Sequence, residues 1–269
     1  MKNLLLFAGI IFAGRLDSPT AWTEALVAFA AFCAASSAAY LMNDIRDASA
    51  DRLHPRKRLR PIASGALSPA RAMRLAVGLA ALALCLAAAL GPRFGAFLLG
   101  FAALQVAYTL LLKRVVLADV LTISLLFVIR AAAGAAAVEV RISPWLLACT
   151  LLLALFLASI KRRAELLLVR AGRAPGRDVL AHYSLPLLSW LVAGTAVAIA
   201  VVYSAYTLSD RHGTGMVLTI PFVLFGLGRY LHLADDGQGE EPERALLGDP
   251  ALGLCVVAWT LTAIAVIAG

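Results

Sequence analysis

Long apolar segments alternate with short polar ones along the whole chain. Runs of about 18 or more mostly apolar residues recur, the length that a helix needs to cross the hydrocarbon core of a bilayer. We predict nine apolar helices, over residues 2–14, 20–42, 68–90, 93–112, 116–138, 143–160, 185–207, 214–233 and 250–268. The first is short enough to be re-entrant or interfacial. The pattern predicts an all-α integral membrane protein with about nine transmembrane helices.

The composition agrees with this pattern. Hydrophobic residues make up 62% of the chain, and the mean hydropathy is +0.87. A soluble domain has roughly half apolar residues. No segment looks like a linker between domains, so we expect one transmembrane domain over residues 1–269. The two richest polar loops, 43–67 and 161–184, each follow an apolar helix pair. This suggests two four-helix units whose polar loops meet over one central cavity.

The basic residues are unevenly distributed among the predicted loops. The connections after the second, fourth and sixth helices, with the start of the third, carry 16 of the 24 Lys and Arg residues. The alternate connections carry only Arg15, Arg93, Arg141 and Arg211. The positive-inside rule therefore predicts that the rich loops, the N-terminus and the opening of the cavity face the cytoplasm.

The net charge of +8 does not point to nucleic acid. In a membrane protein it reflects loops near anionic lipid, or a site for an anionic substrate. The four cysteines lie far apart inside apolar runs without metal-ligand spacing, so we interpret them as small buried hydrophobic residues.

The first rich loop begins with clustered carboxylates. Asp44, Asp47 and Asp51 stand at i, i+3 and i+7, and they share one helix face if the helix over 20–42 continues past Met42. Asn43 adds an amide oxygen. Clustered carboxylates repel one another unless a cation lies between them, and hard oxygen ligands suit Mg²⁺. The acids predict a magnesium site; the alternative is a solvated loop with incidental acids.

A basic cluster follows the acids at once. It contains His54, Arg56, Lys57, Arg58 and Arg60. Cations just beyond a magnesium site suit a polyphosphate, because Arg offers bidentate donors and Lys a point charge. Attachment to anionic lipid at the membrane surface is the alternative, above all for Arg56 and Arg58.

Other polar residues interrupt the later apolar segments. Arg130 lies inside a predicted helix, where a charge costs about 2.5–3.5 kcal/mol and usually faces a cavity. Lys113 follows Tyr108 at the end of another helix, where snorkelling would also explain it. Lys161 and Glu165 are one turn apart and could form a surface ion pair. Asp249 precedes Pro250 and could be no more than a helix start.

Four of these segments carry a resemblance to a known family. The stretch NDIRDASADRLHPRKRLRPIASG, from Asn43 to Gly65, resembles the first Asp-rich motif of the UbiA prenyltransferase superfamily. Its basic half looks more like the bacterial branch that transfers phosphoribose to polyprenyl phosphate. The stretches YTLLLKRVVLADVLTISLLFVIRAAAGA, KRRAELLLVRAG and EPERALLGDPALG resemble that branch as well. The likeness covers nearly the whole chain and implies a UbiA-like helical bundle.

One departure from the wider superfamily is informative. Most members carry a second Asp-rich motif after the sixth helix, and the two motifs together hold the diphosphate of a prenyl donor. This chain has Lys161, Arg162 and Glu165 there instead. The resemblance therefore implies transfer of 5-phosphoribose from 5-phosphoribosyl-1-diphosphate to a polyprenyl phosphate, with release of diphosphate. It also implies a multi-pass enzyme of the bacterial inner membrane whose product serves cell-wall synthesis, and it leaves a homo-oligomer open.

The residues that we expect to act in this reaction come from all the polar segments. The expected Mg²⁺ ligands are Asn43, Asp44, Asp47 and Asp51, and the expected catalytic residues are these three aspartates with Lys113 and Arg130. The expected substrate-binding residues are Asn43, Arg46, His54, Lys57, Arg60, Tyr108, Lys161, Arg162 and Glu165.

Two alternative functions stay open. The first is a UbiA-type prenyltransferase that moves an isoprenoid from its diphosphate to an aromatic or other small acceptor. The second is a transporter of an anionic metabolite. Charge at the membrane midplane is essentially limited to Arg130, which disfavours a two-sided pathway.

Overall fold

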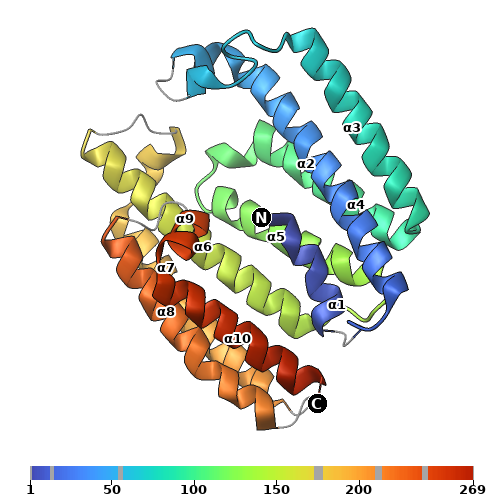
Figure 1. Ribbon diagram of the computed structural model, residues 1–269. Helices are drawn as coiled ribbons and strands as arrows, with labels where there is room; N and C mark the ends of the chain where they lie inside the picture. Colours follow the sequence, from blue (N-terminus) through green and yellow to red (C-terminus); the bar gives the residue numbers. More distant parts are fainter. Residues whose placement is uncertain are drawn as a thin grey trace. The chain divides into compact units, whose positions relative to one another are not determined.

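The computed structural model describes residues 2–12, 15–53, 57–172, 178–209, 214–237 and 242–268. Within these ranges the regular elements are helices (Figure 1). Seven of them are long and apolar enough to cross a membrane, and two shorter apolar helices cover Lys2–Ile11 and Pro250–Val266. The prediction of an all-α membrane protein is confirmed, with the first and last of the nine predicted helices being the shorter ones.

The contacts gather into two compact units, which divide within helix α5. We call residues 2–110 and 129–141 the N-terminal unit, and residues 111–128 and 142–269 the C-terminal unit. The sequence predicts a single domain with a central cavity open to the cytoplasm, and that arrangement stays a prediction.

The N-terminal unit is built around one long helix, α2, against which α3 packs. Its elements are η1 (Lys2–Phe7), α1 (Ala8–Phe12), α2 (Pro19–Leu53), η2 (Lys57–Leu59), α3 (Pro69–Ala89), α4 (Pro92–Leu110) and the second half of α5 (Ala118–Ala137). Phe32 of α2 contacts the rings of Phe94 and Phe101 of α4 at centroid distances of 5.8 and 5.1 Å. These aromatic contacts join α4 to the long helix.

The C-terminal unit contains most of the remaining helices. Its elements are η3 (Leu112–Arg114), the first half of α5, α6 (Pro144–Arg170), η4 (Asp178–His182), α7 (Leu185–Leu208), η5 (Thr214–Thr219), α8 (Ile220–Asp235), α9 (Pro242–Gly248) and α10 (Pro250–Ala268). Helix α7 packs against α6 and α8, and α10 packs against α8 (Figure 1). Phe156 and Ile160 of α6 share a buried core with Val192 and Ile199 of α7.

Two helices are longer than the apolar pattern predicts. We expected them to end near residues 42 and 160, and they continue to Leu53 and Arg170. The prediction was wrong because it placed each helix end at the end of the apolar segment. The helical backbone continues into the polar residues that follow. Ala, Arg, Leu and Glu in these extensions favour a helix. No Pro or Gly interrupts either extension before Pro55 and Gly172.

The first short helices pack very closely on α5. A Cβ added to Gly134 would lie 2.1 Å from the carbonyl oxygen of Leu6, and one added to Gly9 would lie 2.8 Å from the backbone nitrogen of Ala135. The alanines on either side of Gly134 are almost fully buried. The small residues at 131–137 therefore let the N-terminal segment lie backbone to backbone on α5.

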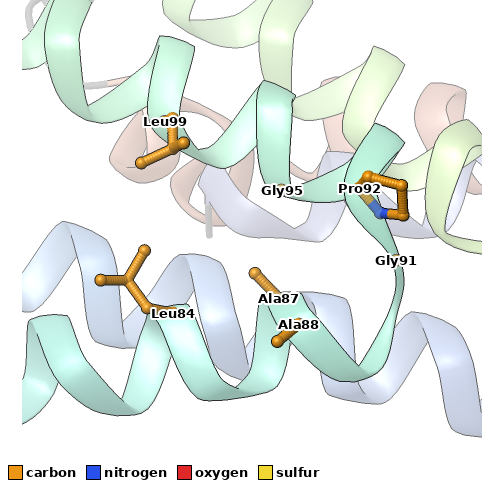
Figure 2. A pocket seen from close by; sticks show the side chains of 7 residues that line it. All are labelled: Leu84, Ala87, Ala88, Gly91, Pro92, Gly95 and Leu99. Carbon is orange, nitrogen blue, oxygen red and sulfur yellow. The ribbon is translucent and has the colours of Figure 1, made fainter.

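A shallow apolar pocket lies at the turn between α3 and α4 (Figure 2). It is lined by Leu84, Ala87, Ala88, Gly91, Pro92, Gly95 and Leu99. Gly91 has φ +90°, which a glycine adopts without strain and which closes the turn. The lining offers no charged side chain to an anion, which distinguishes this pocket from the polar clusters elsewhere in the protein.

Candidate functional site

Two aspartates of α2 converge on one arginine in the N-terminal unit. Because α2 continues to Leu53, Asp44 and Asp51 stand two turns apart on one helix face. Arg60 Nη1 donates to Asp44 Oδ1 at 2.9 Å and to Asp51 Oδ2 at 2.8 Å. A single guanidinium nitrogen therefore contacts both carboxylates and offsets one of their two negative charges.

A folded turn after η2 positions Arg60. The amide N–H of Arg60 donates to the Lys57 carbonyl at 2.9 Å, and the Ser64 N–H donates to the Arg60 carbonyl at 2.9 Å. Ile62 is buried against Ala48 of α2 and anchors the turn on that helix. The apolar anchor brings Arg60 back to the acidic face of α2.

The cluster is not uniformly buried. The Asp51 side chain is 5% exposed, whereas the Asp44 and Arg60 side chains are 26% and 38% exposed. Burial of the Asp51 carboxylate requires a positive partner, and Arg60 is that partner here. The arginine that supplies this charge is itself within reach of water and of soluble anions.

The donors in this cluster suit a hard divalent cation. Carboxylate oxygens are ligands that Mg²⁺ prefers, and the Arg60 nitrogen shows that a cation fits between two of them. Asn43 and Asp47 lie half-buried on the same helix segment. Among the described residues no three His, Cys, Asp or Glu side chains group as they would around a bound metal ion. The four-ligand set of Asn43, Asp44, Asp47 and Asp51 therefore stays a prediction.

The remaining predicted residues of the N-terminal unit lie near the ends of its helices. Arg46 Nη1 donates to the carbonyl of Thr109 at 3.1 Å, which ties the α2 extension to the end of α4 beside the half-buried Tyr108. Lys57 is exposed on η2. His54 lies outside the described residues. The structure thus joins Arg46 to the vicinity of Tyr108, which their spacing in sequence did not indicate.

Arg130 is buried in the N-terminal unit, with 5% of the residue exposed. Its Nε donates to Asn3 Oδ1 at 2.8 Å, and its guanidinium carbon lies 4.5 Å from the centre of the Phe101 ring. An amide oxygen and an aromatic face both stabilise a desolvated guanidinium. Sequence reasoning missed both partners, because Asn3 is 127 positions away and belongs to the short first helix.

A second acid–base cluster lies in the C-terminal unit and is almost fully buried. Arg162 Nε lies 2.9 Å from Asp119 Oδ2, and the side chains are 3% and 1% exposed. These two atoms form an ion pair without hydrogen-bond alignment. Arg162 also donates to Glu165, one turn further along α6. The hydroxyl of Tyr183 donates to Asp119 Oδ1 at 2.5 Å.

This network fixes an unusual backbone conformation. The Leu117 N–H donates to the Tyr183 hydroxyl at 2.8 Å, and Leu117 has φ +66°, in the left-handed region that a branched side chain rarely adopts. Burial, together with the hydrogen bond to Asp119, raises the pKa of Tyr183 far above its ordinary value. The phenol therefore keeps its proton and remains a donor to Asp119.

The buried network contains two predicted substrate-binding residues, Arg162 and Glu165. Of the predicted lysines, Lys161 is exposed on α6 and Lys113 is half-buried on η3. Arg162 and Glu165 instead contact each other, and Arg162 also contacts Asp119. Spacing could not reveal the roles of Asp119 and Tyr183, because they are 64 positions apart.

Asp249, which directly precedes the last helix, has a structural role. Asp249 Oδ1 accepts from the Leu252 N–H at 2.7 Å, and Arg229 Nη2 donates to Asp249 Oδ2 at 2.6 Å. The Arg229 guanidinium holds the pKa of Asp249 below its ordinary value, with help from the Leu252 N–H. The interpretation of Asp249 as a helix start is confirmed.

Sequence comparison connects these clusters to known proteins. Residues 4–249 match the UbiA prenyltransferase family. The decaprenyl-phosphate phosphoribosyltransferase of Corynebacterium glutamicum is 35% identical over 270 residues, covering 96% of this chain and 81% of that protein. The protein of the same name from Mycobacterium tuberculosis is 34% identical over 275 residues, covering 100% of this chain and 91% of that protein.

Structure comparison gives the same fold. A UbiA homolog from Archaeoglobus fulgidus, solved bound to DMAPP and Mg²⁺, superposes with a TM-score of 0.75. The alignment covers 99% of this chain and 95% of that chain, at 16% sequence identity. The predicted UbiA-like bundle is therefore confirmed as the fold.

Proposed function

The chain belongs to the UbiA prenyltransferase family, and on that premise we propose that this multi-pass membrane transferase is a polyprenyl-phosphate 5-phosphoribosyltransferase. It would transfer 5-phosphoribose from 5-phosphoribosyl-1-diphosphate to a polyprenyl phosphate and release diphosphate. The names of the relatives from Corynebacterium and Mycobacterium, which align over nearly the whole chain, support this substrate pair.

The observation that carries the proposal is the convergence of Asp44 and Asp51 on Arg60. It combines hard oxygen ligands with a cationic donor suited to phosphate, on a helix that extends beyond its apolar segment. Asp44, Asp51 and the neighbouring Asp47 and Asn43 would hold Mg²⁺. The metal would supply neutralisation of the leaving diphosphate.

The residues at the end of α6 support a phosphate acceptor over a prenyl diphosphate donor. A second metal site for a prenyl diphosphate would need further carboxylates there, and the chain has Lys161, Arg162 and one acid, Glu165. Arg162 already pairs with Glu165 and Asp119. We propose Lys161 and Lys113 as phosphate-binding residues of the C-terminal unit, and Lys57 and Arg60 as those of the N-terminal unit.

The reaction requires little proton transfer. The C1–O bond to diphosphate breaks, and an oxygen of the lipid phosphate forms the new bond to C1 from the opposite face, which inverts the anomeric carbon. That oxygen is already ionised near neutral pH, so no strong general base is needed. Catalysis rests on orientation of the reactants and on fixed charges. Arg130 and Tyr108 are the other proposed contributors to this polar environment.

The placement in the cell belongs to the same proposal. The excess of Lys and Arg in alternate loops favours an active site that faces the cytoplasm. The bacterial relatives support a location in the bacterial inner membrane. A water-soluble, strongly anionic donor would arrive from that side, while the lipid acceptor would arrive through the bilayer.

A membrane assay with labelled phosphoribosyl diphosphate and polyprenyl phosphate tests the proposal. We expect Mg²⁺-dependent label in the organic phase from the wild type and a loss of at least about 100-fold in Asp44→Asn. Asp17→Asn, the same change beyond the opposite end of α2, serves as the matched control and should retain activity.

Two results would contradict the proposal. Label transferred from a prenyl diphosphate to an aromatic acceptor, with none from phosphoribosyl diphosphate, would favour a prenyltransferase. Substrate binding without turnover, together with flux into proteoliposomes, would favour a transporter.

A further inference from the structure

We propose that Arg60 is a resident counter-ion that competes with the divalent metal for Asp44 and Asp51, so that the metal binds tightly only together with the diphosphate of the donor. This inference rests on the proposed function for the identity of the diphosphate. Its physical basis lies in the contacts of Arg60 itself.

The first step is that one atom occupies the position between the acids. Arg60 Nη1 lies within hydrogen-bond distance of an oxygen of each carboxylate. A divalent cation bound to the same two carboxylates would lie next to the Arg60 guanidinium and would be repelled by its positive charge. Guanidinium and metal therefore cannot both keep these oxygens as close partners, and the binding of one weakens the binding of the other.

The second step is that Arg60 can leave. Its side chain is 38% exposed and comes from a surface turn, whereas the Arg162 side chain in the other Asp–Arg cluster is 3% exposed. The Arg60–Asp44 pair is partly exposed, and such pairs are weak enough for a better partner to replace the arginine. Asp51 is 5% exposed, and it keeps a positive partner in the exchange because the incoming metal takes the place of Arg60. A buried pair has no such exchange route, because moving the charge would leave a carboxylate unpaired.

The third step is that a diphosphate is such a partner. Arginine binds phosphate oxygens with two parallel N–H donors, a contact stronger than one shared nitrogen. When Arg60 turns to the diphosphate, Asp44 and Asp51 become available to the metal, which binds the same diphosphate. Metal and diphosphate should therefore bind with positive coupling, and the coupling is reciprocal because it is a free energy shared by both ligands.

The test is Mn²⁺ binding to the purified full-length protein, measured by electron paramagnetic resonance with and without inorganic diphosphate. Free Mn²⁺ is matched between samples because diphosphate itself binds the ion. In the wild type we expect weak Mn²⁺ binding that diphosphate strengthens. In Arg60→Gln we expect Mn²⁺ without diphosphate to bind about five- to tenfold more tightly, and the effect of diphosphate to shrink by the same factor.

Two variants control the test. Arg58→Gln removes the same charge from an exposed arginine two positions away, and its Mn²⁺ binding should match the wild type. Asp51→Asn should lose Mn²⁺ binding in either condition. If Arg60→Gln does not fold, the wild type alone decides, because equal Mn²⁺ affinity with and without diphosphate would overturn the proposal.

The failure of this inference and the failure of the proposed function are distinguishable. Unchanged or weaker Mn²⁺ binding in folded Arg60→Gln would refute the counter-ion role, even if phosphoribosyl transfer is observed. Tighter binding in that variant, in a protein that transfers no phosphoribose, would refute the proposed function and leave the counter-ion role in place.

Discussion

The two units of this protein use the same pair of side chains, Asp and Arg, in opposite surroundings. In the N-terminal unit, Arg60 bridges Asp44 and Asp51 from a position that water reaches. In the C-terminal unit, Arg162 and Asp119 pair in near-complete burial, with Glu165 and Tyr183 as further partners. The first arrangement leaves its arginine within reach of solvent, and the second encloses it. Burial, not residue type, distinguishes the two clusters.

The largest expected effect concerns the buried pair. Arg162→Leu leaves the Asp119 carboxylate buried and unpaired, which should reduce the free energy of unfolding by about 3–5 kcal/mol. Thermal unfolding of the purified protein in detergent measures it. The neighbouring Arg163→Leu is the matched control, because Arg163 pairs with Asp235 at the surface, and it should cost at most about 1 kcal/mol. Similar losses in both variants would break the contrast between the clusters.

The next effect concerns Arg130, a buried arginine that contacts neutral groups. Gly134→Ala would place a methyl group 2.1 Å from the Leu6 carbonyl oxygen and so displace the segment that brings Asn3 to Arg130. We expect a loss of about 1–3 kcal/mol in the same unfolding experiment.

Gly100→Ala is the control for this change, because nothing lies within 4 Å of a Cβ at that position of α4. It should be neutral or stabilise by about 0.5–1 kcal/mol. A harmless Gly134→Ala would mean that the N-terminal segment does not depend on this close approach.

A smaller effect tests the hydroxyl that completes the buried network. Tyr183→Phe should cost about 1 kcal/mol near neutral pH, through the lost hydrogen bonds to Asp119 and Leu117. The pKa of Tyr183 is raised in the folded state, so its contribution is complete below the ordinary value of 10.0 and is lost as pH rises above it.

The measurement is unfolding stability between about pH 8 and pH 11 for wild type and Tyr183→Phe. The wild type should lose stability more steeply above about pH 10, because the unfolded state then releases the Tyr183 proton. Parallel curves for the two proteins would show that Tyr183 is not held protonated.

The smallest effect belongs to a pair that, like the Arg60 cluster, joins a partly exposed arginine to a largely buried carboxylate. The pKa of Asp249 is lowered beside Arg229, so the pair stabilises the protein above the ordinary value of 3.8 and loses this contribution as the pH falls below it. Asp249→Asn retains an acceptor for the Leu252 N–H. The unfolding midpoints of variant and wild type should differ slightly near pH 7 and converge as the pH falls below 3.8. A large difference that persists in acid would assign the effect to helix capping.

More of the polar cluster could be predicted from the sequence in the N-terminal unit than in the C-terminal unit. The acids at 44, 47 and 51 could be identified because helical spacing is a local property, and the helix does continue through them. That Arg60 closes on two of them depends on a turn anchored by Ile62, which no spacing rule contains. Arg162 was expected to face the substrate, and its pairing with Asp119 could not be foreseen from positions 43 apart in the chain.

The helical membrane architecture and the segment that carries the acids could be predicted from the chain alone, because hydropathy and periodicity act between residues close together in sequence. The UbiA type was indicated by the resemblance of its motifs, not by these patterns. Only the folded structure shows which arginines are within reach of solvent and which are enclosed, because solvent exposure is set by segments that are far apart in the chain and meet only on folding.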